Sequence, residues 1–185
     1  MSDRNGTFML TASGRRFWPL DPRADEVDLW DIAQALANQG RYNGHTRHFY
    51  SVAQHCVELA RWFLKQGNVD HARWACVHDA AEAYTGDMIR PLKPHFPEFI
   101  EVERKVERLV FDALGMRGEL PKAVHDADKL IVRDEQLVLF PLEAIQREGI
   151  DKKARLGIEI RALMPNVARD RWLALHHELF VARAA

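Results

Sequence analysis

The chain is poor in cysteine, in long apolar runs and in net charge, and each shortage argues against a class of protein. Its two cysteines, Cys56 and Cys76, form neither a CxxC pair nor a disulfide framework, so we expect two free thiols. The 26 Lys and Arg against 27 Asp and Glu leave a formal net charge of -1, which disfavours binding to nucleic acid polymers or anionic membranes. No run approaches the roughly 18 apolar residues of a membrane span, and no apolar leader follows the first residues, so we expect a cytoplasmic protein.

Helical periodicity dominates the 185 residues and predicts an all-α fold in a single domain. Most apolar stripes end near a glycine or begin at a proline, the residues that typically mark helix ends and starts. The first 22 residues, with their glycines and prolines, predict a short hairpin or an extended arm, and segment 87–94 predicts a structured loop. We expect helices over about 29–40, 52–67, 72–86, 99–115, 121–140, 151–163 and 165–181.

Polar groups concentrate in the stretch HDAAEAYTGD, residues 78–87, which is otherwise small and apolar. On a helix, His78 and Glu82 share a face, and Asp79 can reach the same point. His55 and Asp128 lie in two further amphipathic segments, so three helices are expected to direct ligand groups inward. Two imidazoles and two carboxylates suit one divalent metal ion (Mn, Co, Fe, Ni, Zn or Mg), and such a site can activate water for hydrolysis.

This arrangement resembles a known family. His55, the adjacent His78 and Asp79, and the distant Asp128 are similar to the signature of the HD-domain metal-dependent phosphohydrolases. The run from His78 to Asp87, followed by Pro-Leu-Lys at 91–93, resembles the 5′-deoxynucleotidase branch and related small HD hydrolases. The resemblance implies a single HD-type helical bundle, with an N-terminal arm over 1–24, an HD core over 25–140 and C-terminal helices over 141–185.

The resemblance also implies a role for each polar residue. The metal ligands would be His55, His78, Asp79 and Asp128. Two carboxylates, Glu82 and Asp87, would serve the attacking water and the proton of the leaving group. Substrate contacts would come from Arg41 and Lys93, through phosphate, and from His45.

The function expected on these grounds is a metal-dependent phosphomonoesterase that releases phosphate from nucleoside 5′-monophosphates, preferably deoxyribonucleotides. Two alternatives stay open: hydrolysis of another nucleotide or phosphoester, including a triphosphate, and a non-catalytic domain that senses a metal or a nucleotide. A helix-turn-helix DNA-binding protein is disfavoured because no segment has a basic, base-reading face. A homodimer is a further prediction, with Leu173, Leu175, Leu179 and Phe180 as candidates for its surface.

Overall fold

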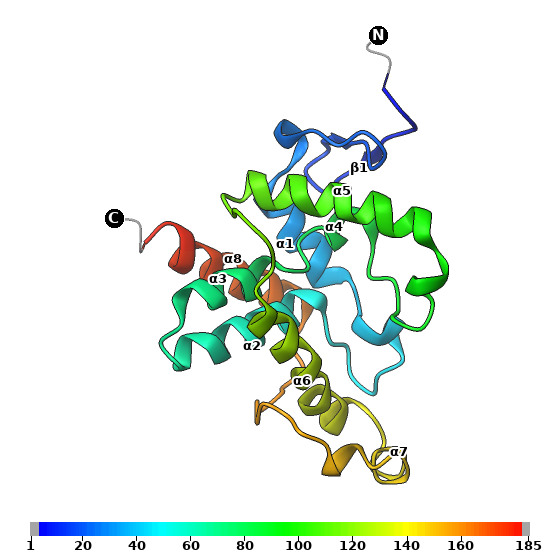
Figure 1. The fold of residues 1–185 in the computed structure, drawn as a ribbon, viewed down its shortest axis with the longest axis vertical. Coiled ribbons are helices and arrows are strands. Elements are labelled where there is room, and N and C mark those ends of the chain that lie inside the picture. Colours follow the sequence, from blue (N-terminus) through cyan, green and yellow to red (C-terminus); the bar gives the residue numbers. More distant parts are fainter. Residues whose placement is uncertain (1–3, 183–185) are drawn as a thin grey trace.

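The computed structural model describes residues 4–182 and consists of helices around a main apolar core, with a small hairpin at the N-terminal end (Figure 1). The predicted all-α fold with a short N-terminal hairpin is confirmed. The longer helices are α1 (Leu29–Asn38), α2 (Val52–Lys65), α3 (Val69–Val77), α5 (Pro97–Ala113), α6 (Lys122–Leu139) and α8 (Pro165–Phe180). The shorter elements are β1 (Met9–Leu10), β2 (Arg16–Phe17), η1 (Ala24–Glu26), η2 (Arg41–Gly44), α4 (Glu82–Thr85), η3 (Lys93–His95), α7 (Leu142–Arg147) and η4 (Ile150–Lys152).

Side-chain caps and prolines fix where several helices begin. Asp28 accepts hydrogen bonds from the first backbone amides of α1, Ser51 does so for α2, and Asn68 does so for α3. Helices α5 and α8 begin at Pro97 and Pro165, whose missing amide proton has no partner at a helix start in any case. These local signals explain why the starts of the helices follow from the sequence.

The core forms where α8 packs against α1, α2 and α3, and α2 packs along α3. Trp172 of α8 is fully buried, and its indole Nε1 donates a hydrogen bond to the carbonyl of Cys76, 2.8 Å away. Leu175 and Leu179 are also fully buried in this core. The prediction that these two leucines form a dimer surface is therefore wrong, because the protein's own helices cover them.

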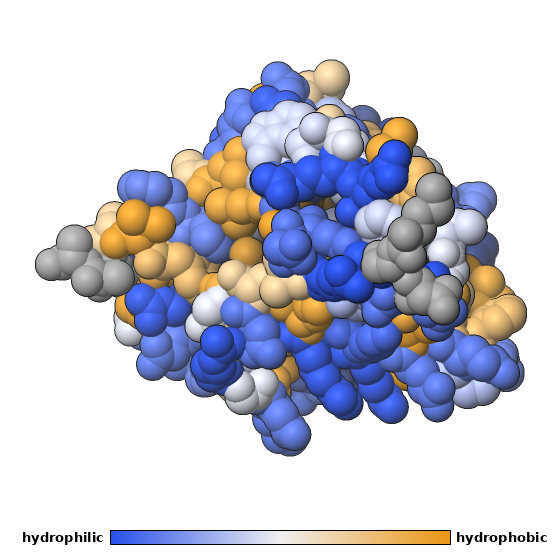
Figure 2. Space-filling view, turned by 90° about the horizontal axis from the view of Figure 1, so that it is seen from above, coloured by the Kyte–Doolittle hydropathy of each residue, from blue (hydrophilic) through white to orange (hydrophobic). Residues whose placement is uncertain are grey.

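The N-terminal arm forms an antiparallel hairpin that is fixed to the helical body. Phe17 is fully buried, and its ring stacks on that of Tyr84 in α4 with 3.9 Å between centroids. The carboxylate of Asp31 in α1 accepts hydrogen bonds from the backbone amide and the hydroxyl of Ser13, each at 2.6 Å. The molecule seen from the end that carries this arm has a mainly hydrophilic face with separate apolar patches (Figure 2).

The helix predicted over 151–163 is not formed. After η4 the chain runs without helical structure to the start of α8. Two buried polar side chains take up its backbone groups instead. Asp134 accepts hydrogen bonds from the amides of residues 156 and 157, and Gln54 bonds the amide of Leu163 and the carbonyl of Arg161. Because these partners come from α6 and α2, tertiary contacts override the local helical pattern.

The structure bears on two expectations from the sequence, the free cysteines and the lack of a membrane-spanning helix. Cys56 and Cys76 are both free and buried. Among residues 4–182, no helix combines the length and the apolar character that a membrane crossing requires.

Candidate metal centre

The His-Asp pair lies in a tight turn between α3 and α4, not within one continuous helix as predicted. Helix α3 ends at Val77, and hydrogen bonds between residues three apart follow it: the amide of Ala80 donates to Val77, and the amide of Glu82 donates to Asp79. This tighter winding changes the directions of successive side chains. His78 Nε2 and Asp79 Oδ1 consequently lie 3.2 Å apart, on the side of the turn that faces α2 and α6.

Helices α2 and α6 bring His55 and Asp128 to the same point. His55 Nε2 lies 3.3 Å from His78 Nε2, 3.1 Å from Asp128 Oδ1 and 3.8 Å from Asp79 Oδ2. His78 Nε2 lies 3.9 Å from Asp128 Oδ1. Ligand atoms bound about 2.1 Å from one ion are separated by about 3 to 3.5 Å, so these spacings are close to those of a metal site. His55, His78 and Asp128 form a possible metal-binding group, with Asp79 beside it.

Each imidazole has its Nδ1 occupied and its Nε2 directed into the group. Nδ1 of His78 lies 2.9 Å from the carbonyl of Ala75, which accepts its proton, and so Nε2 is left as the metal-binding nitrogen. Cys56, His78 and Asp79 also offer ligand atoms within 4.8 Å of one another. However, the Cys56 sulfur lies 3.9 Å from His78 Nδ1, the nitrogen already in use, and burial raises the pKa of this thiol well above its ordinary value. Cys56 is therefore a packed neutral group and a poor ligand.

Glu135 is a buried partner of this centre that the sequence analysis did not identify. It is fully buried on α6, and its Oε1 lies 2.6 Å from Nδ1 of His55. Its position two helical turns after Asp128 places both carboxylates on one face of the helix, which is the signal that was available in the sequence. Arg90, also not identified, lies at the exposed rim with Nη2 3.5 Å from Asp128 Oδ2.

The charges of this cluster shift the pKa values of its members strongly. Burial and the positive charge of Arg41 lower the pKa of His55, but Glu135 and Asp128 raise it by more, to about 9. Burial raises the pKa of Asp128, but its bond to His55 and the positive charges nearby bring it well below its usual range. Asp128 is therefore an ionised carboxylate, as a metal ligand must be.

Arg41 reaches the centre from η2, which has an unusual backbone. Tyr42 and Asn43 adopt left-handed conformations with φ of 56° and 52°, which are uncommon for residues with side chains. Arg41 Nη1 lies 3.7 Å from Asp79 Oδ2, and its Nε lies 3.4 Å from Glu135 Oε2. The structure thus brings the predicted phosphate-binding arginine to the predicted metal ligands.

The two predicted proton-transfer carboxylates lie beside the centre in a poorly solvated environment. Burial, followed by the negative charges of Asp79 and Asp87, raises the pKa of Glu82 well above its ordinary value. Burial also raises the pKa of Asp87, although Arg41 opposes the shift. Among the described residues, the buried Glu82 Oε2 has no hydrogen-bond partner, so one polar atom is available to a ligand or water at this site.

Lys93 and His45, the other predicted substrate contacts, form no hydrogen bond or ion pair with the four candidate metal ligands within residues 4–182. Lys93 forms an ion pair with Glu103 of α5 at 2.5 Å, and its positive charge offsets a small part of the rise in the pKa values of Glu82 and Asp87. His45 follows η2 and is exposed to solvent. Among the described residues, His45 is not part of the possible metal-binding groups.

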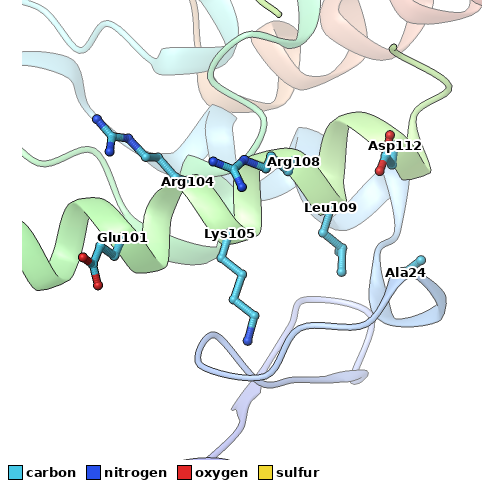
Figure 3. Close-up of a pocket in the computed structure, with 7 residues that line it drawn as sticks. All are labelled: Ala24, Glu101, Arg104, Lys105, Arg108, Leu109 and Asp112. Carbon is cyan, nitrogen blue, oxygen red and sulfur yellow. The ribbon is translucent and has the colours of Figure 1, made fainter. Parts of the chain in front are cut away.

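A separate open groove, with a cavity volume of about 590 Å³, lies between α5 and the chain around η1 (Figure 3). Its lining includes Arg104, Lys105 and Arg108, interleaved with Glu101 and Asp112. These side chains project from a solvent-exposed face of α5, and none of the predicted metal, proton-transfer or substrate residues lines the groove. The groove is therefore separate from the candidate metal centre.

Comparison with known proteins places the chain among proteins of unknown activity. It is 35% identical to the uncharacterised protein YfdR of Escherichia coli over 130 residues, which cover 70% of this chain and 71% of YfdR. It is 31% identical to an uncharacterised protein of Rhodobacter capsulatus over 181 residues, which cover 90% of this chain and 92% of that protein. The chain belongs to the same family as these two proteins. No model of a described protein family matches the chain. The similarity to these two proteins therefore indicates no activity, and the functional assignment rests on the chemistry of the site.

Proposed function

We propose that this protein is an HD-type metal-dependent phosphohydrolase, and that it releases phosphate from nucleoside 5′-monophosphates, with deoxyribonucleotides as the preferred class. One observation carries the proposal. The Nε2 atoms of His55 and His78, from α2 and the α3–α4 turn, lie 3.3 Å apart, and each lies 3.1 to 3.9 Å from carboxylate oxygens of Asp79 and Asp128. A cluster of buried polar groups this dense is stabilised best by a cation that all of them bind.

The donor set fits a divalent metal of the Mn, Co, Fe, Ni, Zn or Mg group. His55, His78, Asp79 and Asp128 would hold it, because they supply two imidazole nitrogens and two carboxylates. Such an ion, when bound, lowers the pKa of a water molecule and neutralises charge that develops on a phosphoryl group. With only four protein ligands, the preferred coordination of most of these metals leaves positions for water and substrate.

The neighbouring carboxylates are suited to managing protons in this reaction. The raised pKa of Glu82 brings its proton transfers closer to neutral pH, where a general acid or base works best. Asp87 lies on the following loop, also with a raised pKa. We assign to Glu82 the orientation of the attacking water, and to Asp87 the proton of the leaving nucleoside oxygen.

Arg41 is suited to binding the phosphate. Its guanidinium can donate two parallel hydrogen bonds to phosphate oxygens, and it is placed next to Asp79. Lys93, whose charge acts on Glu82 and Asp87, would add a second positive charge. His45, at the exposed end of η2, is assigned to substrate contact outside the phosphate.

Phosphate release from a panel of deoxy- and ribonucleoside 5′-monophosphates, with Mn or Co added or with a chelator, tests the proposal. We expect release that depends on the metal and that is lost in Asp79→Ala. Asp126→Asn is the matched control, because Asp126 precedes Asp128 by two residues on α6 but its side chain is half-exposed and pairs with Lys122. Absence of release from every monophosphate would contradict the proposed substrate class and direct the search to triphosphates, other phosphoesters or a sensing role.

A further inference from the structure

Glu135 uses both of its carboxylate oxygens to join three elements of the candidate centre. Oε1 accepts the Nδ1 proton of His55 at 2.6 Å, and Oε2 accepts the hydroxyl proton of Tyr42 at 2.5 Å. The Nε of Arg41 lies 3.4 Å from the same Oε2. One buried side chain of α6 thus contacts α2 and η2 together.

Glu135 is fully buried, and both of its carboxylate oxygens are paired. His55 and Tyr42 each direct a polar hydrogen at one of its oxygens, and Arg41 lies beside the second. An anion with no exposed surface is costly unless it is fully paired. Here the pairing partners are a candidate metal ligand and the candidate phosphate-binding arginine.

The bond to His55 determines which nitrogen of that ring can bind a metal. Because Oε1 holds the proton of Nδ1, Nε2 is the nitrogen that would give up its proton to a metal, and Nε2 lies 3.3 Å from His78 Nε2 and 3.1 Å from Asp128 Oδ1. Carboxylates bonded to a metal-ligating histidine in this way orient the ring and raise its basicity. The other oxygen, Oε2, accepts the hydrogen bond from Tyr42 of η2. Tyr42 has a left-handed backbone conformation that an aromatic residue rarely adopts.

We propose that Glu135 is the positioning residue of the centre: it fixes the ring orientation and tautomer of His55 for metal binding, and it holds Arg41 and Tyr42 against the same site. This inference rests on the proposed metal centre and goes beyond the set of ligands assigned to it. Its specific consequence is that removal or withdrawal of the Glu135 carboxylate weakens metal binding, although Glu135 itself is not a ligand.

The test compares the affinity for Co(II), measured by competition with a chelator, in the wild-type protein and three variants. Glu135→Gln keeps the size of the side chain but removes the charge, and we expect about 10- to 100-fold weaker binding. Tyr42→Phe removes only the bond to Oε2 and should change the affinity by less than about threefold. Asp134→Asn neutralises an adjacent buried carboxylate that binds segment 155–157, so it should lower stability and leave the affinity unchanged.

A second readout reports on His55 directly. In the zinc-loaded wild-type protein, the Nδ1 proton of His55 should give a downfield NMR resonance typical of a strong hydrogen bond to a carboxylate, and Glu135→Gln should shift or remove it. If Glu135→Gln does not fold, Glu135→Asp replaces it, since it keeps the charge but withdraws the carboxylate by one methylene. Either replacement should weaken Co(II) binding more than Tyr42→Phe does.

The outcomes separate this inference from the proposed reaction. Wild-type affinity in folded Glu135→Gln, or an equal loss in Asp134→Asn, would overturn the role of Glu135 even if the enzyme hydrolyses nucleotides. A wild-type protein that binds Co(II) tightly but releases no phosphate would refute only the reaction, and the comparison of affinities would still decide the role of Glu135. A wild-type protein that binds no Co(II) would refute both.

Discussion

The burial of His176 predicts that the protein loses stability in mild acid through one identifiable side chain. His176 lies on α8 with 8% of its surface exposed, and its ring stacks between Trp172 and Phe180, whose centroids are 5.5 Å and 4.4 Å away. Among the described residues, neither of its ring nitrogens has a hydrogen-bond partner. Burial, assisted by the neighbouring His177, lowers the pKa of His176 to about 4.

The sign and size of the effect follow from proton linkage. The unfolded chain binds a proton near pH 6.5 and the folded chain only near pH 4, so the unfolded state holds more protons between these values. Stability is therefore full above about pH 6.5, decreases as the pH falls, and levels off below about pH 4. The free energy of unfolding should drop by about 2 kcal/mol at pH 5 and by about 3 kcal/mol in total.

Urea unfolding of the wild-type protein and of His176→Phe between pH 4 and pH 7.5 measures this contribution. The replacement keeps an aromatic ring in the stack but cannot bind a proton, so the difference in unfolding free energy between the two proteins should change by about 2 kcal/mol from pH 7.5 to pH 5. His176→Leu provides a smaller apolar side chain in case the larger ring is strained. A difference that stays constant with pH in both variants would refute the assignment to His176.

Three further substitutions probe the site and the fold. Glu82→Gln should lower kcat by about 10²- to 10⁴-fold with the metal content unchanged, measured by steady-state phosphate release and metal analysis. Arg41→Lys should raise KM for a nucleoside monophosphate by at least about tenfold, because an ammonium group cannot make the two-pronged phosphate contact; an unchanged KM would contradict the assignment. Gln54→Leu should lower the free energy of unfolding by about 2 to 4 kcal/mol in urea titrations, because the amide of Leu163 and the carbonyl of Arg161 lose their partners.

The helices, and the inward direction of the predicted metal ligands, could be predicted because both follow from the spacing of apolar residues along the sequence. His55 and Asp128 each lie within an apolar stripe, so the period of the helix alone directs them towards the core. The adjacent His78 and Asp79 need only a helical or tightly turned backbone to face the same way. The break between α3 and α4 was missed because alanine-rich sequence around Ala80 and Ala81 is compatible with a continuous helix.

Glu135 and segment 153–164 were harder to predict because their environments come from distant parts of the chain. From the sequence alone, Glu135 resembles a charged residue on the exposed face of a helix. Its burial depends on contacts with Tyr42 and Arg41, which are distant in the sequence. Segment 153–164 has apolar spacing that is compatible with a helix, but Gln54 and Asp134 bind its backbone in another conformation. In both cases a buried polar side chain, whose partners cannot be read from local spacing, decides the structure.

The central claim is that His55, His78, Asp79 and Asp128 together hold one divalent metal ion. Anomalous diffraction from crystals of the protein grown with Mn(II) tests it most directly, because the signal locates the ion independently of any assay. We expect a single strong peak about 2.0 to 2.3 Å from Nε2 of both histidines and from an oxygen of each carboxylate, and no such peak in crystals of Asp128→Asn. A wild-type crystal with no ion at this point, or with the ion bound only elsewhere, would contradict the claim.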